Sequence, residues 1–416
     1  MTSKLLWLRF LIMNAFRNLW RSPRRTIFSL LAIAAAATSL MLSQSYIDGV
    51  KVTFRQNLIT AVYAQYQIYK KGYRTNQGDD PFGYQIAESD KIRKALEEKV
   101  GPVTFFSRRQ RFFGLVNFND RSLSGIGMGV DAEQEKSFMT LNQVVEGKHL
   151  AGSKLESVFL ATGLAEQLKV KPGDMISVVT STAGGSLNAA DLEVVGVFKT
   201  GIREVDTSTF YVHQELVQKL LRTTGPSQIL IGFAGEDELK YKAALRQVIQ
   251  KDFPDLEVVH WYELAGDMFD NSMGWLESVF FVFRIIIVTV ATLSILTVFM
   301  ISLLERTGEF GTLRAIGTYR NEIASLIFIE SILQSVLGGL LGIVISVVAI
   351  YLPLKSGITM PPPPSMTAAF HVMFRVPWHG IGTTLALCIA VAGGSGIFPA
   401  VKISRLNIVE ALGRNV

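Results

Sequence analysis

The chain has little of what most enzymatic and metal sites need. Its one cysteine, Cys388, lies in an apolar run, so no disulfide can form within the chain. The five histidines are scattered and none shows HxxxH or HExxH spacing. No G-x4-G-K-[ST] sequence occurs, so the common phosphate-binding loop of ATPases is missing. We therefore predict no catalytic residue and no metal site in this chain.

Long apolar runs, in contrast, are abundant. Hydrophobic residues make up 49% of the 416 residues, and the mean hydropathy is +0.31. Four runs approach or exceed the roughly 20 residues that cross a bilayer, and we predict spans at 26–46, 278–304, 323–352 and 380–400. A cleaved signal peptide is the alternative for the first run, but the charged region before it is long for a signal peptide.

Basic residues indicate how these spans are oriented. Lys and Arg concentrate in residues 1–25, 305–322 and 401–416, which fall on one side if there are four spans. The positive-inside rule places these segments, including both termini, in the cytoplasm. Residues 1–25 are expected to form an amphipathic helix on the membrane surface, with a short fifth span as the alternative. Residues 47–275 and a Pro-rich loop at 353–378 are then expected outside, in the periplasm of a bacterial inner membrane.

The segment 47–275 has the pattern of an α/β domain. Alternating or aromatic-rich stretches predict strands at 64–74, 103–118, 228–233 and 256–261, with helices at 90–100 and 236–250. Two β-α-β-like units thus flank an insertion at about 131–226. Within it, 163–178 predicts a helix, a Pro-Gly-Asp turn and a strand, 191–199 predicts a strand, and 180–190 a flexible loop.

Residues 305–317, ERTGEFGTLRAIG, form a short charged element between the second and third spans. Apolar residues recur every third position, charges can fix the register of a partner, and glycines allow close approach. This pattern resembles the coupling segment of MacB/FtsX/LolC-type permeases, the membrane subunits of a class of ABC transporters. The resemblance implies that these residues contact an ATPase: Glu305, Arg306, Glu309, Phe310, Gly311, Leu313, Arg314 and Gly317. The alternative is a solvated turn.

Two further stretches are similar to the same families. Residues 163–178 and the strand DLEVVGVFK at 191–199 resemble the periplasmic core domain of MacB and LolC. Residues 398–412 resemble the common C-terminal sequence, although Asn407-Ile408 replaces its usual proline step. The implied fold is four transmembrane helices with a large α/β periplasmic domain, in which a porter-like lobe carries an inserted second lobe.

The resemblance also implies function and partners. ATP and Mg²⁺ would be bound by a separate ABC ATPase subunit, and a second permease subunit would complete a homo- or heterodimer; nucleic acid is not expected. The length of 47–275 suits the lipoprotein-releasing LolC/LolE branch, so we expect mechanotransmission that extracts a lipoprotein or other hydrophobic substrate toward a periplasmic carrier. The alternatives are an FtsX-like regulator of periplasmic enzymes and a MacB-like drug, peptide or toxin exporter.

Polar residues inside the spans are further candidates, because an ionisable group in lipid is costly. Glu330 and Gln334 fall in the third span, where a transport role competes with a structural ion pair or hydrogen bond. Arg284, near the outer end of the second span, either extends to lipid headgroups or faces a cavity. An apolar wall beside Arg284 suggests a path for a lipid-anchored substrate, lined by Leu42, Phe280, Phe281 and Phe283; ordinary helix packing is the alternative.

Overall fold

The computed structural model describes residue 13 and residues 15–17, 19–20, 23–139, 143–235, 238–352, 354–361 and 369–404. The chain divides into two compact units, which we describe separately. One comprises residues up to 52, 273–358 and 371 onward. The other comprises residues 53–272 and 359–370. The predicted segments 1–25 and 401–416 lie largely outside the described residues, and within 353–378 residues 353 and 362–368 lie outside them.

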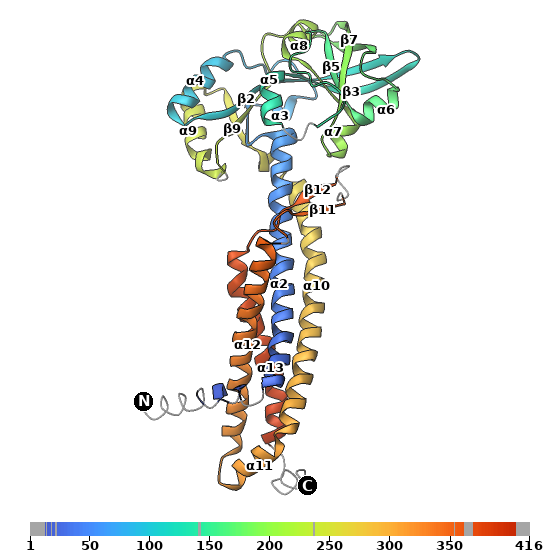
Figure 1. The fold of residues 1–416 in the computed structure, drawn as a ribbon. Helices are drawn as coiled ribbons and strands as arrows, with labels where there is room; N and C mark the ends of the chain where they lie inside the picture. The colour runs from blue at the N-terminus through green and yellow to red at the C-terminus, as the bar shows by residue number, and fades with distance from the viewer. Residues whose placement is uncertain are drawn as a thin grey trace. The chain divides into compact units, whose positions relative to one another are not determined.

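The first unit is helical (Figure 1). Its helices are α2 (Pro23–Leu58), α10 (Trp261–Glu305), α11 (Thr307–Ala315), α12 (Arg320–Tyr351) and α13 (Trp378–Ser404). Residues 53–58 of α2 and 261–272 of α10 belong to the second unit. Four of these helices are long and apolar enough to cross a membrane, and each overlaps one of the predicted spans over nearly its whole length.

Glycines set how closely α12 approaches its neighbours. A Cβ atom added at Gly338 would lie 2.8 Å from Ile33 Cβ, and one at Gly342 would lie 2.5 Å from the carbonyl oxygen of Ala34. Both therefore let α12 lie directly against α2. Gly339 performs the same function toward α13, where a Cβ would lie 3.0 Å from Leu385. Such small-residue contacts are how helices associate in lipid, where hydrophobicity gives no preference for protein neighbours.

The second unit is built on a mixed sheet. Its strands, in chain order, are β1 (Tyr66–Lys70), β2 (Val103–Phe118), β3 (Arg121–Val130), β4 (Gln143–Gly147), β5 (Ser157–Ala161), β6 (Met175–Ser181), β7 (Leu187–Lys199), β8 (Thr209–His213), β9 (Gln228–Phe233) and β10 (Leu256–His260). They lie in the order β10-β1-β9-β2-β3-β8-β5-β7-β4, and β6 pairs with β2 and β7. Pairs β3–β8 and β5–β7 are parallel. Two short strands, β11 (Ile358–Met360) and β12 (Phe370–Val372), form a separate pair.

Short helices accompany the sheet (Figure 1). They are the π-helical turn η1 (Ile59–Tyr63), α3 (Tyr73–Asn76), α4 (Ser89–Lys99), α5 (Ala132–Phe138), α6 (Thr162–Leu168), α7 (Arg203–Ser208), α8 (Gln214–Leu221), the 3-10 turn η2 (Glu238–Tyr241) and α9 (Lys242–Asp252). The strands and helices predicted at 64–74, 90–100, 103–118, 228–233, 236–250 and 256–261 are thus confirmed in type.

The two largest hydrophobic cores of the second unit share the long strand β2. Phe106 packs with α4, α9, β1 and β9. Phe112 and Val116, further along β2, pack with α6, α8 and β5 to β8. The second core therefore begins inside β2, before the predicted insertion boundary at 131. The reason is that β2 has 16 residues and is roughly 50 Å long, enough to enter two cores.

The flexible loop predicted at 180–190 is wrong for most of its length. β6 and β7 pair through these residues, for example Thr180 with Asn188, and only 182–186 form the turn. Gly185 in this turn has φ +81°, a conformation that favours glycine. Small polar residues favour loops, although here they line an exposed hairpin.

Candidate functional site

Arg306 occupies the junction between α10 and α11 and forms its polar centre. Its Nη1 donates to both carboxylate oxygens of Glu330 on α12, at 3.1 Å each. Its Nε donates to Glu309 Oε2 at 3.2 Å, and its guanidinium lies 5.1 Å from the ring centre of Phe310. The Arg306 and Glu330 side chains are only 10% and 12% exposed. One arginine thus joins α10, α11 and α12.

An apolar cluster lies beside this ion pair. It contains residues from all four helices that meet here: Leu303 of α10, Phe310 of α11, Ile323 and Ile327 of α12, and Ala400 of α13. α11 is therefore packed into the helical unit by its Phe310 face. Gly317, with φ +104°, follows the end of α11, and the Glu322 carboxylate accepts the Tyr319 N–H at 3.0 Å as α12 begins.

The structure separates the residues of the segment that can meet a partner from those that cannot. Glu305 and Glu309 are exposed, Leu313 and Arg314 are half-buried, and Gly311 is buried. Ile316 is 76% exposed. Arg306 and Phe310, expected at the partner-facing surface, point inward instead.

Helix geometry explains this correction. At 3.6 residues per turn, each three-residue step turns the side chain by about 60°, so residues six apart differ by about 120°. Phe310, Leu313 and Ile316 therefore do not share one face. The first is buried, the second is half-buried and the third is exposed.

Gln334 lies one turn beyond Glu330. It is 6% exposed, and its Oε1 has no hydrogen-bond partner among the described residues. The pairing of Glu330 with Arg306 fits the structural alternative for that glutamate. The charge is compensated inside the chain, as a nearly buried carboxylate requires.

A second polar group lies where α2 and α10 run together. Arg284 donates to Gln44, whose side-chain amide donates to Asp48 at 2.9 Å, and Lys51 pairs with Glu277. An open cleft of about 790 Å³ adjoins these groups and is lined by Arg284 and Phe281 among others.

The four residues of the predicted substrate path differ in exposure near this cleft. Phe281 and Phe283 are exposed, whereas Leu42 and Phe280 are half-buried. Phe280 stacks on Tyr46 of α2 with ring centres 5.2 Å apart. Packing between helices therefore accounts for Phe280, while Phe281 is open to the cleft.

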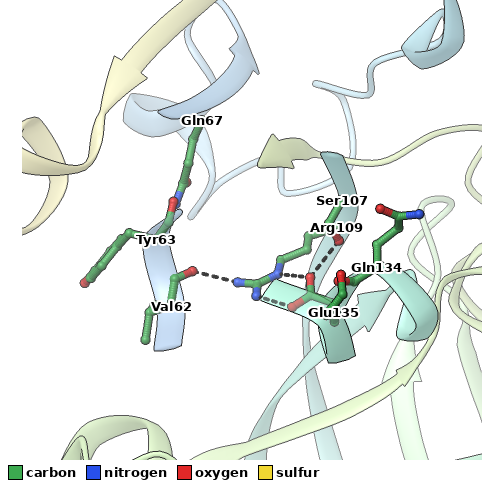
Figure 2. A network of polar contacts seen from close by, with 8 residues as sticks. Val62, Tyr63, Gln67, Ser107, Arg109, Gln134 and Glu135 are labelled. Atoms are coloured by element: carbon green, nitrogen blue, oxygen red, sulfur yellow. Dashed lines mark hydrogen bonds and ion pairs between the residues drawn. The ribbon is translucent and has the colours of Figure 1, made fainter. Parts of the chain in front are cut away.

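The sequence analysis missed a buried ion pair in the second unit. Figure 2 shows Arg109 of β2 facing Glu135 of α5, with Nε–Oε1 and Nη2–Oε2 distances of 2.8 and 2.7 Å. Ser107 donates to the same carboxylate at 2.6 Å, and Arg109 Nη1 donates to the carbonyl oxygen of Val62 in η1 at 2.8 Å. Burial alone would lower the pKa of Arg109, but the attraction and hydrogen bonds to Glu135, with smaller contributions from Tyr211 and Tyr69, together outweigh it and raise the pKa.

This network fixes the turn that follows α2 onto the sheet. The signal in the sequence was the pair Arg108-Arg109 inside a strand. Adjacent strand residues point to opposite faces, so a strand with one covered face must bury one of the two arginines.

Comparison with known proteins identifies the chain's relatives. Residues 26–248 match the MacB-like periplasmic core domain, and residues 281–408 match the FtsX-like permease C-terminal region. The ABC transporter permease MJ1507 of Methanocaldococcus jannaschii is 25% identical over 285 residues, 65% of each chain. The ABC transporter permease YtrF of Bacillus subtilis is 21% identical over 454 aligned positions, 96% of this chain and 98% of its own.

Other similarities are partial. The macrolide export ATP-binding/permease protein MacB of Photorhabdus laumondii is 28% identical over 137 residues, which cover 31% of this chain and 18% of MacB. The extracellular domain of the transporter YknZ covers 47% of this chain and all of its own, with 15% identity and a TM-score of 0.34. Together the two family matches extend over most of the sequence, one on each side of residue 260. The chain is a multi-pass membrane protein that belongs to the MacB/FtsX-type family of ABC transporter permeases.

Proposed function

We propose that this permease couples a separate ATPase to work done on a hydrophobic substrate at the membrane surface. The observation that carries the proposal is the junction of α10, α11 and α12. A nine-residue helix with an exposed charged and apolar surface is fastened to two candidate spans by Arg306. A push on that surface is passed to both spans because α11 has little freedom to move alone.

The exposed residues of α11 and of its two ends define the expected docking surface for the ATPase. Ile316 offers an apolar contact, and Glu305 and Glu309 offer charges that select a partner and its register. ATP and Mg²⁺ would be held by the ATPase, since the sequence contains no Walker A motif. The Lys/Arg distribution supports a cytoplasmic position for this surface and a periplasmic one for the second unit.

A second permease subunit fits the exposure of α10. In the apolar stretch of α10 that could cross a membrane, only 6% of the residues are buried within the chain, against 33–44% in the corresponding stretches of the other three candidate spans. That face needs either lipid or another copy of the permease, and two ATPase subunits would then serve two permease subunits.

For the substrate we propose a lipoprotein or another lipid-anchored molecule, extracted from the inner membrane toward a periplasmic carrier. The cleft beside Arg284 supports this, because it joins exposed aromatic surface on Phe281 to a cation that suits a polar or anionic head. Export in the manner of MacB is the second candidate, favoured by the matches to MacB sequences. Regulation of periplasmic enzymes in the manner of FtsX is the third.

The coupling role is tested with a matched pair of substitutions. Ile316→Ser and Leu239→Ser each remove an exposed apolar side chain, 76% and 63% exposed, and Leu239 lies in the second unit. After affinity purification from native membranes, Ile316→Ser should lower the ATPase activity that accompanies the permease, at unchanged permease yield. Leu239→Ser should not. Equal ATPase recovery for both variants would remove α11 from the coupling surface.

The substrate is tested with a photo-crosslinking residue in place of Phe281. A lipidated protein should be captured, and capture should fall when ATP is supplied to the assembled complex. Capture of a water-soluble drug or peptide instead would favour MacB-like export. Crosslinks to lipid alone in every nucleotide state would contradict a substrate path at the cleft beside Phe281. That result would favour the FtsX-like alternative.

A further inference from the structure

The second unit contains a polar cavity that the coupling function does not use. Its volume is about 490 Å³, within the range of small-ligand sites. It lies where the ends of β3 and β8 meet the starts of α5 and α8, and Arg108 of β2 contributes to its wall. Every residue that lines it belongs to this one unit.

Gln214 is the most informative residue in this cavity. It is 8% exposed, yet neither its amide oxygen nor its amide nitrogen has a hydrogen-bond partner among the described residues. A buried amide without partners is costly, and natural structures keep few of them. The chain also makes room for it: a Cβ atom at Gly129 would lie 2.7 Å from Gln214 Oε1. The unpaired donor and acceptor thus belong to a residue that lines the cavity, and a ligand reaches them when the Gln214 side chain turns toward it.

The charges around the cavity are mostly negative. Asp131 lies 3.6 Å from Arg108, so these two partly compensate each other. Glu133 and Glu215 are exposed at the first turns of α5 and α8, and neither forms an ion pair within the described part of the chain. The cavity therefore carries an excess of negative charge over its one arginine.

His213 does not offset this excess. Burial lowers its pKa below the ordinary value, so the ring is neutral near pH 7. Ser153 Oγ lies 3.0 Å from His213 Nε2 but donates its own proton to the carbonyl oxygen of Leu150 at 2.6 Å. The serine proton is thus directed to that carbonyl and not to the histidine, whereas an activated serine nucleophile needs its proton on the histidine. The pair is suited to binding and not to acyl transfer.

We propose that this cavity binds a basic residue of a peptide in extended conformation, with its cationic side chain near Glu133 and Glu215 and its own backbone N–H and C=O on Gln214. The N–H and C=O of one residue in extended backbone point to the same side. Together they can donate to the amide oxygen of Gln214 and accept from its amide nitrogen, so one extended residue satisfies both unpaired atoms at once. A free polyamine shares the cationic chemistry but has no carbonyl to accept from the Gln214 NH₂ group. The site is independent of the ATPase coupling proposed above.

The test uses the full chain in lipid nanodiscs and isothermal titration calorimetry with three probes. N-acetyl-lysine methylamide carries the cation and two peptide groups, spermidine carries cations alone, and N-acetyl-glutamate methylamide carries the opposite charge. The lysine probe should bind more tightly than either of the others. Equal binding of spermidine would overturn the role of Gln214, and equal binding of the glutamate probe would overturn the role of charge.

Variants locate the site. Gln214→Leu should raise the Kd of the lysine probe by about tenfold, since the loss of two hydrogen bonds is of that order. Its melting temperature should not fall, because an unpaired buried amide is replaced by an apolar group of similar size. The double variant Glu133→Gln/Glu215→Gln changes two exposed residues and should also weaken binding.

The control is Glu166→Gln, an exposed residue of α6 that does not line the cavity. It should leave the Kd unchanged. Absence of measurable binding by the wild-type chain, or equal Kd values in all variants, would refute the proposal.

Discussion

Neutralising Arg306 should destabilise the helical unit more than removal of any surface ion pair. Arg306→Met removes two hydrogen bonds to Glu330 and one to Glu309, and it leaves the Glu330 carboxylate in a site where only 12% of the side chain meets solvent. Removing one partner of a buried pair costs about 3–5 kcal/mol. Because methionine preserves much of the side-chain volume, this loss arises from charge and not from a cavity.

A double-mutant cycle isolates the pair. Glu330→Met alone should also be costly, but less so, since Arg306 keeps its contact with Glu309. The double variant Arg306→Met/Glu330→Met places two apolar side chains together, and such replacements of buried pairs are often close to neutral. The coupling energy should therefore exceed about 1 kcal/mol, well above the few tenths expected of independent sites.

The matched control is Lys51 with Glu277, an ion pair of the same helical unit whose side chains are 38% and 52% exposed. Removing either partner should cost no more than about 1 kcal/mol. The unfolding free energy of every variant is measured by circular dichroism, under the same conditions, as the fraction of denaturing detergent in mixed micelles is raised. If Arg306→Met lies within about 1 kcal/mol of wild type, or the cycle is additive, the reasoning from burial is refuted.

The remaining predictions test a second buried charge, helix packing and topology. Arg109→Met should lower the unfolding free energy by about 3–5 kcal/mol, because its carboxylate partner stays buried; an unchanged urea midpoint would contradict this. Gly342→Leu should abolish folded expression, judged by size-exclusion chromatography, because the larger side chain would collide with α2. Gly382→Leu should not, because a Cβ atom added at Gly382 meets no atom within 4 Å. Similar elution profiles for the two variants would contradict the close approach of α12 to α2. A cysteine at Thr318, after Cys388→Ser, should resist an impermeant reagent added outside intact cells, and rapid labelling would reverse the proposed orientation.

The spans and most strands follow from the sequence because their signals are local. Hydropathy over some twenty residues marks a helix that can enter lipid, and alternation marks a half-buried strand. The sharing of β2 between two hydrophobic cores has no such local signal in the sequence. It depends on β2 pairing with β9 at one end and with β6 at the other, which no window along the chain contains.

The candidate site was only partly predictable for a related reason. Its residue types and its glycine boundary were recognisable, because they lie within thirteen consecutive positions. The partner of Arg306 is 24 residues away and on another helix. A three-residue repeat in a nine-residue helix also gives too little length to decide which side faces the core.

The position of Glu330 along α12 indicates how deep in the membrane this charged residue can lie. It is the eleventh residue of α12, so about 15 Å of helix precede it at a rise of 1.5 Å per residue. Its contact with Arg306, the residue after α10, places it level with the end of that helix. The first turns of α12 thus extend past α10, and α11 packs on that extension through Phe310, Ile323 and Ile327.

If α10 ends near the membrane surface, Glu330 lies at that surface and not in the middle of the bilayer, where an ionised carboxylate would be most costly. Residues 331–351 still supply the roughly twenty residues that a span requires. The Glu330–Arg306 ion pair then lies at the membrane edge. There it would transmit a movement of α11 to the third span.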